Sequence, residues 1–149
     1  MTSYGSGHVT IFVTAIDTWL DSPLLGSGIK SFRIKCKDKL KLPNRVCESH
    51  PHNYYLEILT ETGLIGFFLT ITIFSIILYR TFYKKYFVDS SHLINNKIII
   101  PFIFLFIAEI FPIKSTGSFF TTGNATYIFL IMAILIGLAG KEKIIENKF

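Results

Sequence analysis

Three long apolar stretches constrain the fold of this chain more than any other feature of its sequence. Residues 62–79 carry no charged side chain, residues 98–113 carry only Glu109, and residues 115–140 carry none. A membrane-spanning helix needs about 20 apolar residues, with a range of roughly 17 to 25. The first and third stretches meet this requirement, and the second is short, as expected of a broken or tilted span. The sequence therefore predicts an all-α integral membrane protein with about three transmembrane helices within residues 62–140.

The composition supports this fold class. Half of the 149 residues are hydrophobic, 15 of them are phenylalanine, and the mean hydropathy is +0.49. A soluble domain of this size has too little interior to bury so much apolar surface, whereas a bilayer accommodates it. The first residues have neither a basic start nor an apolar run, so no secretory signal is recognised there. We therefore expect the chain to be the later part of a longer protein.

The distribution of lysine and arginine predicts how the chain is oriented in the membrane. Basic residues in short loops mark the cytoplasmic side, and they occur in the loop at 80–97 and in the tail at 141–149. They are Arg80, Lys84, Lys85, Lys97, Lys141, Lys143 and Lys148. Three spans would then place residues 1–61 on the opposite, periplasmic side, together with Lys114.

A cluster of seven basic residues runs against this orientation. It consists of Lys30, Arg33, Lys35, Lys37, Lys39, Lys41 and Arg45, with Asp38 as the one acid among them. Such a cluster typically meets phosphate, and in a chain with membrane spans we expect the phosphate of a lipid and no nucleic acid. Since long loops are translocated with less regard to charge, we interpret the cluster as held outside for a purpose. An inverted orientation is the alternative.

Residues 8–21 are predicted to form an amphipathic helix. Apolar residues recur at three- and four-residue steps, namely at Ile11, Phe12, Ala15, Ile16, Trp19 and Leu20. Polar residues fall on the other side, namely Thr10, Thr14, Asp17 and Asp21. Trp19 suits a membrane interface, although packing of this helix on protein is equally compatible with the pattern. Pro23 and the run Gly26-Ser27-Gly28 then end the helix.

This glycine run is similar to the start of a dinucleotide-binding turn, but the comparison fails. Ser31 stands where the third glycine should be, and no strand precedes the run. A glycine-rich turn beside Lys30 and Arg33 could still present backbone N–H groups to an anion. A plain turn explains the run equally well.

Cys36 and Cys47 are the two cysteines of the chain. In an oxidising compartment they could close a loop with one disulfide, and two free thiols are the alternative. A zinc site would need two further ligands. His50 and His52 lie close in the sequence, but the spacing fits no common zinc module.

The segment 47–57, Cys-Glu-Ser-His-Pro-His-Asn-Tyr-Tyr-Leu-Glu, carries the most chemistry. Histidine is the side chain best suited to exchange a proton near neutral pH, and Asn53 or Glu57 could fix its tautomer. We expect a helix from about His50 to Gly63, capped by Ser49. An ordinary polar segment at a membrane edge is the alternative interpretation.

Two further features lie near the predicted outer ends of the second and third spans. An intramembrane acid is a functional candidate by default, but Glu109 lies four residues before Ile113. We therefore expect it at the interface, paired with Lys114. The polar segment 114–122 is expected on the same side as His52, where it could line a shared site.

Several motifs together resemble the O-antigen ligase and polymerase superfamily. The first is Pro-Leu-Leu-Gly-Ser-Gly at 23–28, followed by Ser-Phe-Arg at 31–33. The second is His-Pro-His-Asn at 50–53, followed by Leu-Glu-Ile-Leu-Thr-Glu-Thr-Gly-Leu-Ile-Gly at 56–66. Residues 111–122 are similar to the last outer loop of that family. The chain would then hold the second half of the family's large periplasmic loop, at residues 1–61, its last three spans, at 62–140, and a cytoplasmic tail, at 141–149.

The resemblance implies a glycosyltransferase of the bacterial inner membrane that serves lipopolysaccharide or polysaccharide biosynthesis. Its donor would be a glycan on undecaprenyl pyrophosphate, and its acceptor a hydroxyl group of a lipid or a saccharide. His52 would be the catalytic base, supported by His50, Asn53 and Glu57, in an inverting transfer that needs no metal and no cofactor. Arg33, Lys30 and Lys35 would bind the donor pyrophosphate.

The chain departs from the family pattern in two respects. Many members carry an arginine just before the first helix of the loop, where this chain has His8, and further donor-binding arginines would lie upstream. We therefore expect activity to need more than these 149 residues. A protein O-oligosaccharyltransferase of the same superfamily is one alternative. A small non-catalytic membrane protein, with a metal or nothing at His50 and His52, is the other.

Overall fold

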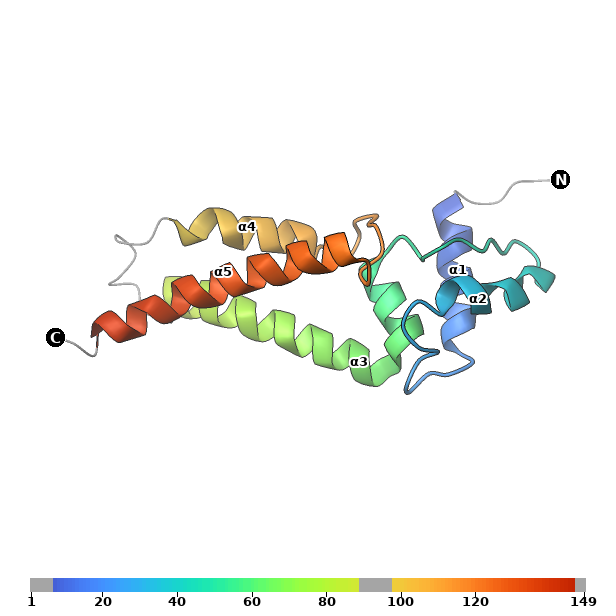
Figure 1. Cartoon of the computed structure of the whole chain (residues 1–149), viewed down its shortest axis with the longest axis horizontal. Helices are drawn as coiled ribbons and strands as arrows, with labels where there is room; N and C mark the ends of the chain where they lie inside the picture. Colours follow the sequence, from blue (N-terminus) through green and yellow to red (C-terminus); the bar gives the residue numbers. More distant parts are fainter. Residues whose placement is uncertain (1–6, 89–97, 147–149) are drawn as a thin grey trace. The chain divides into compact units, whose positions relative to one another are not determined.

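The computed structural model describes residues 7–88 and 98–146, except for the side chains of 84–88 and 140–146. All regular elements in these two ranges are helical (Figure 1), which confirms the predicted all-α class. They are α1 (Gly7–Trp19), α2 (Phe32–Lys35), the 3-10 helix η1 (Cys36–Lys41), α3 (Tyr54–Leu78), the π-helix η2 (Tyr79–Val88), α4 (Ile99–Glu109) and α5 (Thr122–Glu146).

Two helices are long and apolar enough to cross a membrane. The first runs from Tyr54 to Tyr83 over α3 and the start of η2, and the second from Thr122 to Ala139 in α5. The expected second span contains α4, which has 11 residues and so falls short of a full crossing. Its bounds follow from two prolines, because Pro101 is tolerated in the first turn and Pro112 disfavours helix at the residue before it. The basic residues that gave the orientation include Lys84, Lys85, Lys97, Lys141, Lys143 and Lys148, whose side chains lie outside the described part.

The chain divides into two compact units. The first comprises Met1–Thr70 and Pro112–Asn124, and the second comprises Ile71–Phe111 and Ala125–Phe149. In the second unit, Phe74 of α3 packs edge-on against Phe106 of α4 with ring centroids 5.5 Å apart. Its interior and its surface are both apolar, which is typical of helices that face lipid. The buried side chains include Ile99, Ile103, Phe106, Ile128, Ile131, Met132 and Leu135, and the exposed ones include Ile73, Phe104, Phe129 and Ile136.

In the first unit, α1 is a helix as predicted, and its buried stripe combines two of the predicted apolar residues with two threonines. The buried stripe consists of Ile11, Thr14, Ala15 and Thr18, whereas Ile16 and Leu20 are 43% and 59% exposed. The Thr18 hydroxyl donates a hydrogen bond to the Thr14 carbonyl at 2.7 Å. Because the threonines satisfy their hydroxyls within the helix and are short, they let neighbouring segments approach closely.

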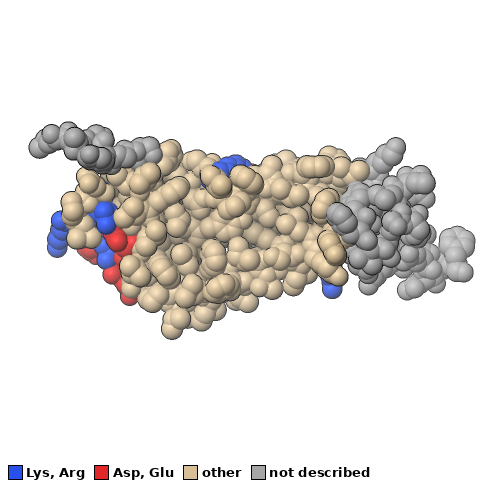
Figure 2. Space-filling model, turned by 180° about the vertical axis from the view of Figure 1, so that it is seen from behind, with Lys and Arg blue, Asp and Glu red and all other residues tan. Residues whose placement is uncertain are grey.

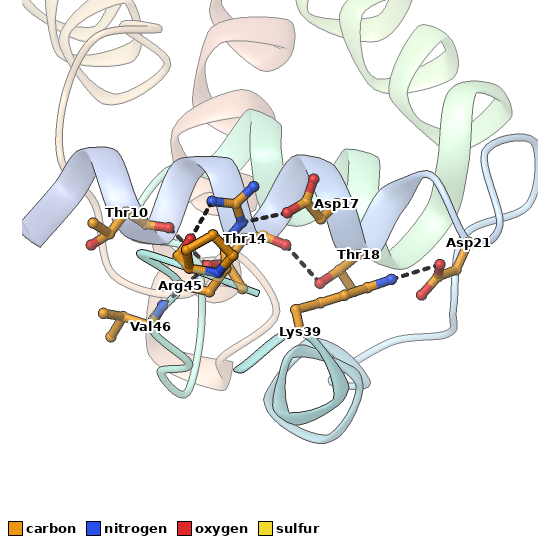
Figure 3. A network of polar contacts seen from close by, with 9 residues as sticks. Thr10, Thr14, Asp17, Thr18, Asp21, Lys39, Arg45 and Val46 are labelled. Atoms are coloured by element: carbon orange, nitrogen blue, oxygen red, sulfur yellow. Dashed lines mark hydrogen bonds and ion pairs between the residues drawn. The ribbon is translucent and has the colours of Figure 1, made fainter. Parts of the chain in front are cut away.

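The basic segment is fastened to the same side of α1 (Figure 3). The Arg45 Nε donates to Asp17 Oδ2 at 2.5 Å, and Lys39 Nζ pairs with Asp21 Oδ1 at 2.7 Å. The Val46 N–H donates to Thr14 Oγ1 at 3.2 Å. Two of the seven clustered cations therefore neutralise Asp17 of α1 and Asp21 just after it.

A disulfide joins Cys36 to Cys47, whose Cα atoms are 5.2 Å apart. It belongs to a small core with Ala15 and Phe32, against which Leu56 of α3 also packs. The disulfide thus joins the basic segment, at Cys36, to Cys47, which lies three residues before the His-Pro-His-Asn motif.

Candidate functional site

A kink in α3 is the local feature from which the candidate site is built (Figure 1). At Gly63 the backbone leaves the helical region, with φ 66° and ψ −168°. In an unbroken α-helix the N–H groups of Leu64 and Ile65 would donate to the carbonyls of Thr60 and Glu61, four residues earlier. The kink leaves these two donors and two acceptors to find other partners.

The loop that follows α1 supplies all four missing partners. The carbonyls of Pro23 and Leu24 accept the two N–H groups of α3 that lack a helical partner. The N–H groups of Ser27 and Gly28 donate to the two carbonyls of α3 that lack one. The bonds are Leu64 N–H to Pro23 O at 2.9 Å, Ile65 N–H to Leu24 O at 3.3 Å, Ser27 N–H to Thr60 O at 3.0 Å, and Gly28 N–H to Glu61 O at 2.9 Å. The Pro-x-x-Gly-x-Gly and Glu-x-Gly motifs are therefore two halves of one backbone junction.

Two glycines make this junction sterically possible. Gly26 and Gly63 both have positive φ, at 71° and 66°. A Cβ atom on Gly26 would collide with the backbone of Glu61 and Gly63, and one on Gly63 would collide with the backbone of Leu24. The glycine run thus allows close approach of two backbone segments. The sequence left an anion-binding turn and a plain structural turn open, and these contacts support the structural turn.

The Glu61 carboxylate extends the junction to the basic segment. Its side chain is buried, and it accepts hydrogen bonds from the N–H groups of Lys30, at 2.5 Å, and Phe32, at 3.5 Å. Lys30 adopts a left-handed backbone with φ 60°. Glu61 therefore fixes the turn from which the exposed Lys30 and Arg33 side chains project. Sequence reasoning did not single out Glu61, although its place in a Glu-x-Gly motif was a usable signal.

At the start of α3, the helix begins later than predicted. It starts at Tyr54, and Asn53 is its cap, with Oδ1 accepting from the N–H groups of Tyr55 at 3.0 Å and Leu56 at 3.2 Å. The predicted start near His50 with a Ser49 cap is wrong, because His52 has a left-handed backbone with φ 57° that a helix does not contain.

The amide group of Asn53 also forms a hydrogen bond with the segment Pro112–Asn124, which belongs to the same compact unit. Its Nδ2 donates to the Pro112 carbonyl at 2.7 Å. One helical turn later, the buried Glu57 carboxylate accepts from Ser118 Oγ and from the Phe119 N–H, both at 2.5 Å. Glu57 thus holds the segment 112–124 in place. The interaction proposed for it from sequence, with a histidine ring, is not the one that its carboxylate makes.

Three histidines gather next to this segment. The ring centroid of His52 lies 4.3 Å from that of His50 and 6.0 Å from that of His8 in α1. His52 is half-buried, and Ser49 Oγ lies 2.9 Å from His50 Nδ1. The Thr116 N–H donates to the His52 carbonyl at 2.9 Å. The structure therefore brings together His50, His52, Asn53 and the segment 114–122.

Burial and neighbouring imidazoles lower the pKa of His52 from its usual value of 6.5. Burial is the largest cause, followed by His50, while Glu48 and a hydrogen bond with the Thr116 backbone act in the opposite sense. A bond that favours the charged form is one in which the ring N–H donates. The Thr116 backbone therefore lies close to His52, and one nitrogen of the neutral ring can serve as a proton acceptor.

The remaining predicted residues are placed as follows. Arg33 and Lys35 lie exposed in α2. Glu109 is the last residue of α4, at the predicted end of the second apolar stretch. In the part of the chain that the structure describes, no group of three or more His, Cys, Asp and Glu side chains is arranged to hold a metal ion.

Comparison with known proteins identifies the N-terminal part of the chain. Residues 5–71 match the family model described as O-antigen ligase, which is slightly less than half of the chain. No curated protein and no solved structure matches the sequence. The matched residues contain the whole α3 junction and the His-Pro-His-Asn motif, so the family resemblance is confirmed there. The resemblance of residues 111–122 stays a prediction.

Proposed function

We propose that this chain, whose residues 5–71 carry the O-antigen ligase domain, contributes the base of a lipid-linked glycosyltransferase. Its reaction would transfer or polymerise a glycan from undecaprenyl pyrophosphate onto a hydroxyl group of a lipid or saccharide. The observation that carries this proposal is the position of His52. It lies within the family match, beside two other imidazoles, and its carbonyl accepts a hydrogen bond from the Thr116 N–H.

In the proposed step, the unprotonated nitrogen of His52 takes the proton of the acceptor hydroxyl. The acceptor oxygen then forms a bond to the anomeric carbon of the donor sugar. The bond between that carbon and the pyrophosphate oxygen breaks, its electron pair leaves with undecaprenyl pyrophosphate, and the anomeric configuration inverts. The lowered pKa of His52 supports this role, because it keeps the ring neutral and able to accept a proton at pH 7.

Negative charge develops on the leaving pyrophosphate and requires nearby cations. We assign this role to Arg33, Lys30 and Lys35. Arg33 and Lys35 are exposed in α2, and Lys30 projects from the turn that Glu61 fixes. Arginine suits pyrophosphate because its planar fork binds two oxygens at once. By contrast, Lys39 is paired with Asp21 and Arg45 with Asp17, so neither is assigned to the donor.

For localisation, we propose the bacterial inner membrane, with residues 1–61 in the periplasm. The two long apolar helices support membrane insertion. The disulfide between Cys36 and Cys47 supports an oxidising compartment for this part of the chain.

The test is glycan transfer in membranes from cells that express the chain in its genomic context. Labelled undecaprenyl-pyrophosphate glycan is the donor, and incorporation into acceptor is measured with and without EDTA. We expect His52→Ala to abolish transfer, whereas Lys37→Ala, at another exposed position, retains it. Undiminished transfer by His52→Ala would contradict the proposal, and zinc binding that is lost in His50→Ala and His52→Ala would support the metal-binding alternative.

A further inference from the structure

An apolar surface patch adjoins the kink of α3. It comprises Leu20, Leu24, Leu25 and Ile65, which are 59%, 62%, 72% and 52% exposed. Single exposed leucines are common on protein surfaces, but contiguous apolar patches mark interaction sites. Leu24 and Ile65 lie side by side in this patch, because the Ile65 N–H donates to the Leu24 carbonyl. Its location, beside the start of a membrane-spanning helix, suggests what covers it.

The patch continues into the surface of that helix. Within the same compact unit, Phe68 and Leu69 follow Ile65 along α3 and are 61% and 60% exposed. The apolar surface of α3 therefore extends without a break onto the loop at 23–28. Charged side chains are sparse here, because residues 22–29 carry none and Asp21 is neutralised by Lys39. On the one face that Figure 2 shows, most of the described surface carries no charged side chain.

The backbone of this loop is also prepared for an apolar environment. A polar group that enters lipid must find its hydrogen bond within the protein. The carbonyls of Pro23 and Leu24 are occupied by α3, and the N–H groups of Gly26, Ser27 and Gly28 all donate to protein carbonyls. Pro23 has no N–H group to satisfy. Together, these hydrogen bonds satisfy five backbone polar groups of the loop within the protein.

Trp19 completes the pattern. Tryptophan is enriched at membrane interfaces because its ring is apolar and its N–H is polar. Here Trp19 Nε1 donates to the Pro23 carbonyl at 3.0 Å, and the side chain is half-buried beside the patch. We propose that the patch of Leu20, Leu24, Leu25 and Ile65 dips into the lipid interface and sets the depth of the loop domain. This inference depends on membrane insertion and not on the proposed glycosyl transfer.

The chain offers its own probe, because Trp19 is its only tryptophan. The full chain is reconstituted into vesicles of phosphatidylethanolamine and phosphatidylglycerol whose acyl chains are brominated either near the headgroup or near the bilayer centre. We expect lipid brominated near the headgroup to quench Trp19 fluorescence at least twofold more than deeply brominated lipid. Aqueous iodide should quench it weakly.

The double variant Leu24→Ser/Leu25→Ser should lose most of the lipid quenching and gain quenching by iodide. The matched control is Leu40→Ser/Leu42→Ser, which changes two exposed leucines of the basic segment outside the patch. The control should behave as the unmodified chain. Circular dichroism verifies that both variants keep their helical content, and the result with the unmodified chain stands whether or not a variant folds.

Two outcomes would overturn the inference. One is strong iodide quenching of the unmodified chain with no effect of brominated lipid, which would place the patch in water. The other is protection of Trp19 from both quenchers that disappears when the chain is diluted with excess lipid. That result would show that a second copy covers the patch.

Discussion

Glu57 and Ser118 are joined by a hydrogen bond of 2.5 Å although they are 61 residues apart in the sequence. Both belong to the first compact unit, where Glu57 follows the proposed base by five residues and Ser118 follows Thr116 by two. The bond therefore links the segment that carries His52 to the segment whose Thr116 N–H donates to the His52 carbonyl. A similar bond from Asn53 to the Pro112 carbonyl anchors the start of the same segment. Asn53 and Glu57 thus hold the segment 112–124 beside His52.

Replacing Glu57 by Gln should loosen the segment 112–124. A neutral amide accepts weaker hydrogen bonds than a carboxylate and places an NH₂ group against one of two donors, which we expect to cost about 1–3 kcal/mol. Hydrogen exchange of residues 116–119 should accelerate while that of α1 is unchanged. Glu48→Gln, at an exposed position, is the control. Unchanged exchange at Phe119 in Glu57→Gln would contradict this role for the carboxylate.

Replacing Gly63 or Gly26 by Ala should break the junction between α3 and the loop. Both glycines have positive φ, and in both a Cβ atom would strike backbone and not a movable side chain. Strain of this kind costs about 1–3 kcal/mol, so the midpoint of thermal unfolding in detergent should fall for each variant. Gly123→Ala is the matched control, because its Cβ would meet open space. A control that loses as much stability as Gly63→Ala would refute the steric explanation.

The lowered pKa of His52 predicts how its charge follows pH. The folded state binds a proton less readily than the unfolded chain, so the ring stays neutral somewhat below pH 6.5. Activity that needs the neutral ring should be lost only as pH falls through this lowered pKa, whereas folding stability should decline as pH falls from 6.5 to the lowered pKa. His50→Ala should raise the pKa of His52 toward 6.5, because His50 is one cause of the shift. NMR titration of the histidine ring protons checks both statements, and a value above 6.5 in the unmodified chain would contradict them.

The pairing of Cys36 with Cys47 predicts the redox state of the chain. In protein purified from membranes without reductant, neither thiol should react with an alkylating reagent, and both should react after reduction. Cys36→Ser/Cys47→Ser should lose about 2–4 kcal/mol of stability, the usual effect of removing a native disulfide. Mass spectrometry of alkylated peptides measures the first effect and unfolding in detergent the second. Full alkylation without reductant would contradict both the bond and the periplasmic location.

The sequence by itself determined the membrane class, the helical content and the resemblance of residues 5–71 to the O-antigen ligase family, because these depend on local composition and on short motifs. Apolar stretches of adequate length predict α3 and α5 without knowledge of any contact. The three- and four-residue spacing at 8–21 likewise predicts α1. The His-Pro-His-Asn and Glu-x-Gly motifs were sufficient to predict the match that residues 5–71 show.

Only the tertiary structure decided which side chains meet. The spacing of residues could not reveal that Ile11 and Ala15 of α1 are buried while Ile16 stays exposed, since the side that is buried depends on which segments pack there. Nor could it reveal that the Thr116 N–H donates to the His52 carbonyl, because the two residues are far apart in the sequence. Glu61 shows the same limit. Its burial is explained only by two backbone N–H groups that a distant loop supplies.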